Sequence, residues 1–304
     1  MVGGSKSVPC FNPLTAYRLD DGSVSLVERG AVHSSLQLPC GKCVGCRLER
    51  SRQWAIRIMH ESSYHDKSSF ITLTYDDDHV PPDYSLRYRD FQLFCRYLRR
   101  DGFKFRYFVC GEYGDNFKRP HFHACIFGLD FSEDGLEPVG KSPAGSVIFS
   151  SKMLSRYWTK GFASVGELSF QSAAYVARYV IKKQSGSEAA SHYRAIDAET
   201  GETFEREPEF VHMSLKPGIG AGWFKKFNSD VFPHDHVVHD GRPTKPPRYY
   251  DVLLKRINPD LYATIKEDRV FDAVAKMADN TPARLAVKEH VALARLSFKK
   301  RSLK

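Results

Sequence analysis

The chain has 304 residues, enough for one large domain with appendages or for two small domains, each with its own core. Its 45 Lys and Arg exceed its 36 Asp and Glu, which gives a net charge of +9, and 13% of its residues are aromatic. This composition favours a polyanionic partner whose bases can stack. No run approaches the ~18 apolar residues of a membrane span, and residues 1–10 lack the apolar core of a signal peptide. We therefore expect a cytoplasmic protein with no membrane partner.

The cysteines suggest a metal site rather than a disulfide framework. Seven is an odd number, which suits a reducing compartment. Cys40, Cys43 and Cys46 are spaced so that three thiolates can surround one ion, and Cys10 can supply a fourth ligand. This pattern predicts a structural Zn²⁺ site, with free, partly buried thiols as the alternative. The remaining cysteines fall on apolar patterns and are expected in the core: Cys95, Cys110 and Cys125.

A helical pattern runs from Cys46 to about His60. Basic and aromatic residues recur on one stripe of this predicted helix: Arg47, Arg50, Trp54 and Arg57. Arginines can follow a nucleic-acid backbone, and a tryptophan among them can stack on a base. The stripe is therefore a predicted DNA-binding face, with an ordinary solvated helix face as the alternative.

A buried strand is predicted at residues 69–75, followed by the acidic cluster 76–78. Three adjacent carboxylates can bind a metal, but after a strand they more often form a solvated turn. The next helix is predicted at about residues 85–100, with Gly102 as its stop signal.

A β-hairpin is predicted from residues 103–112 and 121–127, which are rich in aromatic and β-branched residues. His121 and His123 share one face of the second strand, because successive side chains point to opposite faces. Glu112 ends the first strand and can offer its carboxylate to the same spot. Two imidazoles and a carboxylate can hold a divalent ion with open positions. A polar strand face with two surface histidines is the alternative.

Residues 135–142 match the nucleotide-binding P-loop pattern, but their context contradicts it. Pro143 and Gly145 follow at once and exclude the helix that must begin at the lysine. Pro138 lacks an N–H donor, and Glu137 places negative charge where phosphates would lie. We interpret the match as coincidental and expect no nucleotide cofactor.

After a short helix capped by Ser151 and a strand at residues 162–168, an amphipathic helix is predicted at residues 171–183. Its apolar face carries Ala173, Val176, Ala177 and Val180. Tyr175, Tyr179 and Lys182 recur at one-turn and two-turn spacing on the opposite face. Tyrosines that merely cover the rim of a core are the alternative. A phenolate is also a competent nucleophile on phosphorus when a cation such as Lys182 or Lys183 stabilises it.

The motifs together resemble one known family. The segment from Arg119 to His123, the upstream Glu112, and the paired tyrosines followed by Lys182 are similar to the HUH endonucleases. Within that superfamily the chain resembles the replication initiators of small single-stranded DNA phages of the microvirus, gokushovirus-like type. Further similar stretches are the cysteine-rich segment 40–47, residues 70–75, and residues 217–224. The resemblance covers about residues 10–250.

The resemblance implies a nuclease that nicks an origin in single-stranded or locally melted DNA and starts rolling-circle replication. Glu112, His121 and His123 would hold Mg²⁺ or Mn²⁺, and a tyrosine would form a 5′-phosphotyrosine link. A second tyrosine would allow another cut while the first DNA end is still attached. Arg119 joins the helix stripe as a predicted DNA contact. A host helicase and a host polymerase are expected partners in the cytoplasm of an infected bacterium.

By the same resemblance the fold class is α+β: a central antiparallel sheet flanked by helices, with the metal on the sheet and the tyrosines on a neighbouring helix. We divide the chain into a Cys-rich segment at residues 1–47, an endonuclease domain at residues 48–250, and a helical basic extension at residues 251–304. The polar stretch 184–190 is a predicted linker, and residues 197–202 a predicted turn between two short strands.

Three functions compete at this point. The first is the phage-type initiator. The second keeps the same chemistry in a single-strand transposase or a conjugative relaxase, which the microvirus-like segments outside the site disfavour. The third is a non-enzymatic, zinc-containing DNA-binding protein, which would have no use for a lysine-flanked tyrosine pair near a metal.

Overall fold

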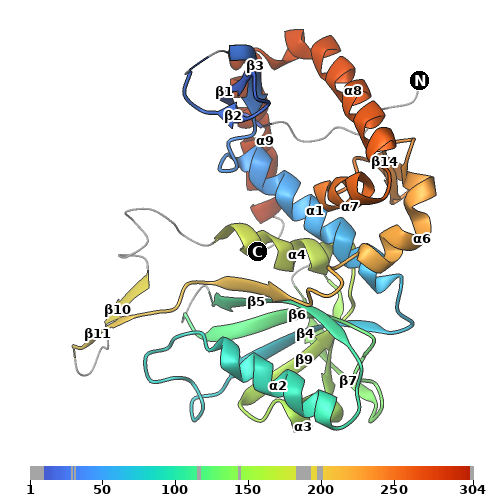
Figure 1. Ribbon diagram of the computed structural model, residues 1–304. Coiled ribbons are helices and arrows are strands. Elements are labelled where there is room, and N and C mark those ends of the chain that lie inside the picture. Colours follow the sequence, from blue (N-terminus) through green and yellow to red (C-terminus); the bar gives the residue numbers. More distant parts are fainter. Residues whose placement is uncertain are drawn as a thin grey trace. The chain divides into compact units, whose positions relative to one another are not determined.

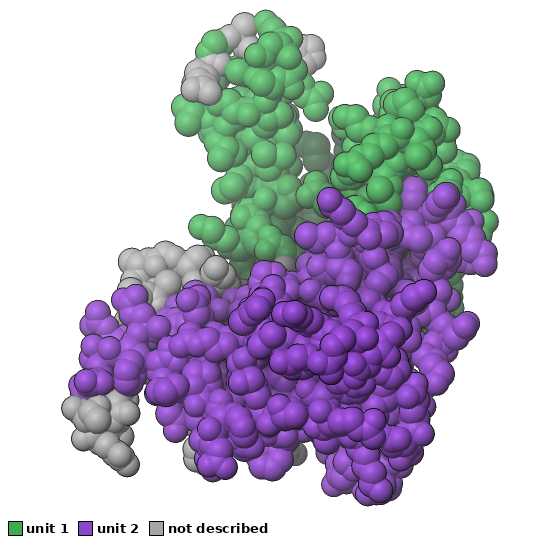
Figure 2. Space-filling view, turned by 60° about the horizontal axis from the view of Figure 1, so that its bottom comes forward, with its two compact units in different colours: residues 1–53, 228–304 green, residues 54–227 purple. Residues whose placement is uncertain are grey.

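The computed structural model describes residues 10–28, 30, 32–114, 118–142, 145–182, 193–196 and 201–301. Contacts divide the chain into two compact units, residues 1–53 with 228–304 and residues 54–227, which are coloured separately in Figure 2. The domain borders predicted at residues 47 and 250 stay predictions, and helix α1 (Val44–Ser62) runs through the first of them. Among the described helices, none combines the length and apolar character that a membrane span needs.

The first unit combines small β elements with helices. Its three-stranded sheet has the order β2 (Val24–Ser25), β1 (Leu14–Leu19), β3 (Val32–Leu38). The C-terminal part contains β13 (Val237–His239), β14 (Arg242–Thr244), α7 (Arg248–Ile257), α8 (Pro259–Ala275), the 3-10 helix η1 (Met277–Asn280) and α9 (Pro282–Arg301). Arg269 on α8 donates hydrogen bonds to the carboxylates of Asp235 and Asp251, which ties α8 to α7 and to the turn before β13. The predicted helical C-terminal extension is therefore confirmed.

The second unit is built on one seven-stranded sheet in which every pairing is antiparallel. In spatial order its strands are β12 (Phe210–Met213), β5 (Arg106–Tyr113), β6 (Pro120–Phe127), β4 (Ser68–Tyr75), β9 (Gly161–Gly166), β8 (Val147–Ser151) and β7 (Leu136–Lys141). Helices lie on both faces of this sheet (Figure 1). The predicted α+β class with a central antiparallel sheet is confirmed.

Alternation along the strands gives the sheet two packed faces. On β4, Ile71, Leu73 and Tyr75 are fully buried, while the residues between them are only half-buried. The buried set packs with α2 (Tyr88–Arg100) and α3 (Lys152–Tyr157) on one face. The opposite face packs against α4 (Phe170–Lys182), whose Ala173, Val176 and Ala177 are buried as predicted. Figure 1 shows α2 and α3 on one side of the sheet and α4 on the other.

The predicted hairpin is confirmed as β5 and β6, which pair from Arg106 opposite Phe127 to Tyr113 opposite Pro120. Phe122 points into the core beneath α2, as its alternation with the two histidines requires. The three cysteines expected in the core are all buried.

The remaining elements follow the predicted pattern. Residues 136–141 form strand β7, paired with β8, rather than a phosphate loop and helix. Ser151 caps α3 by accepting a hydrogen bond from the Leu154 N–H at 3.1 Å. Strands β10 (Arg194–Ile196) and β11 (Thr203–Glu205) pair with each other, and helix α6 covers Ala221–Val231. The predicted linker 184–190 and residues 197–200 of the predicted turn lie outside the described residues.

Candidate active site

Strand register brings the two histidines and the glutamate together on the α4 side of the sheet. Glu112 on β5 pairs directly with His121 on β6, and His123 lies two residues further along the same strand. Paired residues of an antiparallel sheet project to the same face, so all three side chains share it. The ligand atoms that they offer lie within 4.8 Å of one another, so the structure assembles the predicted triad.

The two imidazoles converge on one oxygen of the glutamate. Glu112 Oε1 lies 2.7 Å from His121 Nε2 and 3.0 Å from His123 Nε2. Burial by itself would raise the pKa of the Glu112 carboxyl, but the hydrogen bonds and charges of the two histidines hold that pKa at about 2. The carboxylate is therefore charged throughout the physiological range. Glu112 Oε2 is buried and has no hydrogen-bond partner among the described residues.

The outer nitrogens of both rings are also held. His121 Nδ1 donates a hydrogen bond to the carbonyl oxygen of Arg119 at 3.1 Å, and His123 Nδ1 lies 2.9 Å from the Thr72 hydroxyl. These contacts orient the two rings so that both Nε2 atoms face Glu112. Metal-binding histidines are ordinarily fixed by such a contact at the nitrogen that does not bind the ion.

These observations fit a divalent ion. A buried carboxylate oxygen without a partner and two oriented imidazoles make a ligand set that leaves other coordination positions open to water or substrate. The donors are nitrogen and oxygen, which suits Mn²⁺, and Mg²⁺ with more water in its shell. Glu112, His121 and His123 can therefore hold a metal ion.

Tyr175 on α4 reaches this triad from the helix side. Its hydroxyl donates a hydrogen bond to Glu112 Oε1 at 2.9 Å, and its ring lies edge-on to that of His123. Burial and the nearby Glu112 charge raise the pKa of the Tyr175 phenol above its ordinary value. The Arg178 guanidinium lies 5.4 Å from the centre of the tyrosine ring and acts in the opposite direction.

The other predicted residues of this helix are placed only in part. Tyr179 and Lys182 follow Tyr175 by one and two turns of α4. Lys183 lies outside the described residues. The roles predicted for all three stay predictions.

The predicted DNA-binding residues do not form one exposed stripe. Arg47 and Arg50 are exposed, whereas Trp54 packs against Phe108 with ring centres 5.0 Å apart. Arg57 lies over the Trp54 ring and donates a hydrogen bond to the carbonyl oxygen of Ile219 at 3.0 Å. In the second unit, therefore, this side of α1 belongs to the internal packing.

Arg119 is engaged within the protein as well. Its guanidinium donates hydrogen bonds to the Tyr75 carbonyl oxygen at 3.0 Å and to the Asp77 carboxylate. These bonds fix the backbone whose carbonyl holds His121. Asp77 thus pairs with an arginine in the turn after β4.

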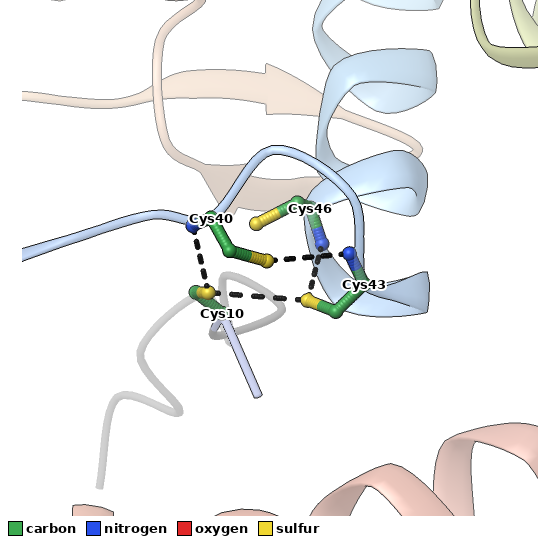
Figure 3. A group of neighbouring side chains, drawn as sticks. All are labelled: Cys10, Cys40, Cys43 and Cys46. Atoms are coloured by element: carbon green, nitrogen blue, oxygen red, sulfur yellow. Dashed lines mark hydrogen bonds between the residues drawn. The ribbon is translucent and has the colours of Figure 1, made fainter. Parts of the chain in front are cut away.

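The four cysteines of the first unit form a second cluster (Figure 3). Their sulfur atoms lie within 4.8 Å of one another and point toward a common centre. Backbone N–H groups donate to the sulfurs of Cys10, Cys40 and Cys43 at 3.2 to 3.5 Å. The structure therefore brings Cys10 to the three closely spaced cysteines, as predicted.

The cluster fits a tetrahedral ion. Zn–S bonds of ~2.3 Å require sulfurs about 3.8 Å apart, and the Cys43 and Cys10 sulfurs lie 3.9 Å apart. Burial would raise the pKa of the Cys43 thiol, but N–H donors from Cys46 and Phe11 lower it to about 6. Burial raises the pKa of Cys10 and of Cys46. A cation would be needed to hold all four sulfurs as thiolates.

Sequence reasoning missed the residues that support the metal triad. Thr72 and the Arg119 carbonyl were not among the candidate site residues. The alternation of residues 69–75 places Thr72 opposite the buried face, which is the only signal for it in the sequence. Which histidine it meets depends on the pairing of β4 with β6.

Comparison with known proteins gives consistent matches. The family model for the ORF2 type of replication-associated protein matches residues 68–184, which include Glu112, both histidines and Tyr175. The replication-associated protein VP4 of Bdellovibrio phage phiMH2K is 34% identical over 238 residues, covering 75% of this chain and 70% of the relative. The replication-associated protein ORF2 of Spiroplasma virus 4 is 33% identical, covering 79% and 74%.

A third relative, the replication-associated protein ORF4 of Chlamydia phage 1, is 30% identical over 78% of this chain and 57% of its own length. No solved structure matches. The resemblance to phage initiators of the microvirus type is confirmed, and the chain belongs to the family of phage replication-associated proteins.

Proposed function

We propose that this replication-associated protein is a single-stranded DNA endonuclease and joining enzyme that nicks the phage origin to initiate rolling-circle replication. The observation that carries the proposal is the Tyr175 hydroxyl 2.9 Å from the Glu112 carboxylate of the metal-binding triad. A nucleophile beside a set of metal ligands is the arrangement that phosphoryl transfer to a side chain requires.

Glu112, His121 and His123 would hold Mg²⁺ or Mn²⁺. When bound, this ion would polarise a non-bridging oxygen of the scissile phosphate. The protein's own contribution is orientation: Thr72 and the Arg119 carbonyl hold the two rings, and β5 and β6 hold all three ligands on one face.

Tyr175 is the proposed nucleophile. A bond forms between its phenolic oxygen and phosphorus while the bond from phosphorus to the 3′-oxygen breaks. The phenolic proton is lost, the departing 3′-oxygen gains one, and the 5′ end stays attached as a phosphotyrosine. Since one phosphoester replaces another, the energy for later rejoining is retained and no nucleotide is needed.

The neighbouring residues of α4 complete the proposal. Tyr179, one turn further along, would make a second cut while the first DNA end is still attached to Tyr175. Lys182 and Lys183 would stabilise a phenolate. The freed 3′-hydroxyl would then attack the phosphotyrosine and close the circle.

The Cys10, Cys40, Cys43 and Cys46 cluster would hold a structural Zn²⁺. The net charge of +9 supports DNA binding, and the exposed Arg47 and Arg50 stay candidates for contacts to phosphates. A host helicase and polymerase would be partners in the cytoplasm of the infected bacterium. The phage relatives favour an initiator over a transposase or relaxase. The hydroxyl of Tyr175 at the triad favours an enzyme over a passive DNA-binding protein.

The deciding experiment replaces both tyrosines by phenylalanine, Tyr175→Phe with Tyr179→Phe. This change removes two oxygens and keeps both rings, so affinity for labelled single-stranded DNA and its salt dependence should hardly change. The covalent adduct that survives denaturation in Mn²⁺ should vanish, as it should for the wild type in excess chelator. Each single variant should keep some cleavage if either tyrosine can make the first cut. A double variant that still forms a 5′-linked adduct contradicts the assignment of α4.

A further inference from the structure

The row of paired residues that builds the metal triad continues across two more strands. Glu112 pairs with His121, His121 pairs with Thr74 on β4, and Thr74 pairs with Phe162 on β9. Directly paired residues project to the same face of a sheet. Phe162 therefore lies on the face that carries the metal ligands. Figure 1 shows β9 beside β4 in the sheet.

The part of this face beside the triad is nearly flat. The side chains around Phe162 on the same face are short and hydroxylated: Thr72, Thr74 and Ser164. Phe162 itself is 70% exposed, and among the described aromatic residues of the second unit it is the most exposed. Its neighbour Ala163 turns to the other face and packs into the core beneath α2.

The backbone that carries Phe162 is held tightly. Gly161 has φ +138°, and a Cβ at this position would lie 2.3 Å from the Asp76 backbone nitrogen and 2.4 Å from the Thr74 carbonyl oxygen. Only glycine allows this close approach between β9 and β4. The ring is thus presented from a fixed strand rather than from a loop.

Phe162 is also at a useful distance from the chemistry. Neighbouring strands lie about 4.8 Å apart, so the two steps from His121 to Phe162 amount to about 10 Å. A single exposed phenylalanine is common on protein surfaces and needs no explanation. What distinguishes this one is its position in the same row as the metal ligands.

We propose that Phe162 is a stacking platform for a base of the single-stranded DNA substrate, next to the scissile phosphate. The proposal rests on the proposed nuclease function. Aromatic rings stack on unpaired bases irrespective of sequence, whereas a duplex keeps its bases inside. The short neighbours leave room for a base, and the threonine and serine hydroxyls can meet its polar edge.

The test measures affinity without chemistry. A fluorescein-labelled oligothymidylate is titrated with the full chain in excess EDTA, and its anisotropy is followed. Phe162→Ala should weaken binding by about 5- to 100-fold, the range that loss of one base–aromatic stack gives. Phe162→Trp should restore the affinity, and Phe162→Leu should not, because leucine keeps an apolar side chain without a ring. Since no charge changes, the slope of affinity against salt concentration should be the same for all four proteins.

Tyr97→Ala is the matched control. Tyr97 is an exposed aromatic residue on α2, which packs on the opposite face of the sheet. Its loss should leave the affinity unchanged. Wild-type affinity in Phe162→Ala overturns the platform, and so does an equal loss in Tyr97→Ala, which would indicate a general effect.

The adduct assay separates this proposal from the nuclease function. If the wild type forms the covalent adduct while Phe162→Ala binds as the wild type does, the platform is wrong and the nuclease stands. If Phe162→Ala loses affinity but the wild type never forms an adduct, then the chain binds single strands through Phe162 and the nuclease is wrong.

Discussion

Thr72 and Thr74 are identical residues on the same face of β4, yet they meet different histidines. Thr72 pairs with His123 and its hydroxyl lies 2.9 Å from that ring. Thr74 pairs with His121, whose Nδ1 is already bonded to the Arg119 carbonyl. The two threonines therefore provide a matched pair for testing whether the support of a ligand matters.

We predict that Thr72→Val lowers the affinity for Mn²⁺ by about 10- to 100-fold, the usual effect of removing a partner that orients a metal ligand. Valine has nearly the shape of threonine and suits a strand, so folding should be kept. Isothermal titration calorimetry with Mn²⁺ measures the effect directly, and Thr72→Ser should recover most of the affinity.

Thr74→Val is the control and should bind Mn²⁺ as the wild type does. If the two valine variants bind the ion equally well, then the Thr72 hydroxyl does not position His123 and the contact is incidental.

At the scale of elements, Glu61 holds three parts of the second unit together. Its carboxylate, at the end of α1, accepts hydrogen bonds from Arg106 on β5 at 2.5 Å and from the Gly220 N–H before α6 at 2.6 Å. His65 lies 3.4 Å away. Burial opposes ionisation, but the hydrogen bonds from His65 and Gly220 and the charge of Arg106 lower the Glu61 pKa below its ordinary value.

We predict that Glu61→Gln lowers the free energy of unfolding by about 2 kcal/mol at neutral pH, because hydrogen bonds to a buried charge are lost. A carboxyl group whose pKa is depressed on folding stabilises the protein above its unfolded pKa, near 4.5. That contribution disappears as the pH falls through the folded value. The difference between wild type and variant should therefore shrink below about pH 4.5. Urea titrations at several pH values measure it.

Glu137→Gln is the comparison for the same substitution at an exposed site. Glu137 on β7 pairs with Lys152 at 3.9 Å, and both side chains are largely exposed. Such a pair contributes no more than about 0.5 kcal/mol. A loss for Glu137→Gln as large as for Glu61→Gln, or a difference that persists in acid, would contradict the role of Glu61.

At the scale of the whole molecule, the two ligand clusters lie in different compact units and use different chemistry. The four thiols belong to the first unit, and the nitrogen and oxygen donors belong to the second. Thiolates favour zinc, and the mixed set with a carboxylate favours a harder ion. The two clusters should therefore lose their metals separately.

We predict that the purified full chain contains about one tightly held zinc. Cys43→Ser should abolish it and destabilise the first unit, because folding there is coupled to the metal. Elemental analysis by mass spectrometry measures the content. Cys95→Ala, a change at a buried core cysteine of the second unit, should keep the zinc. Zinc retained in Cys43→Ser, or a folded wild type without zinc, would return these cysteines to ordinary thiols.

Local patterns in the sequence determined much of this protein. Period-two alternation predicted that His121 and His123 share a face, and the aromatic strands around a polar turn predicted the hairpin that sets Glu112 against them. The spacing of Cys40, Cys43 and Cys46 predicted their cluster, and helical spacing predicted the buried face of α4. Each of these features depends on residues close together in the chain, where backbone geometry alone decides.

Only the tertiary structure decided the contacts between distant segments. The contact of Thr72 with His123, the place of Phe162 in the row of metal ligands, and the hydrogen bond from Tyr175 to Glu112 depend on which strands pair and in what register. Trp54 and Arg57 showed the same limit, since their helical stripe turned inward on Phe108. Alternation says which face a residue occupies but not what packs there, because one pattern is compatible with many pairings of the same strands.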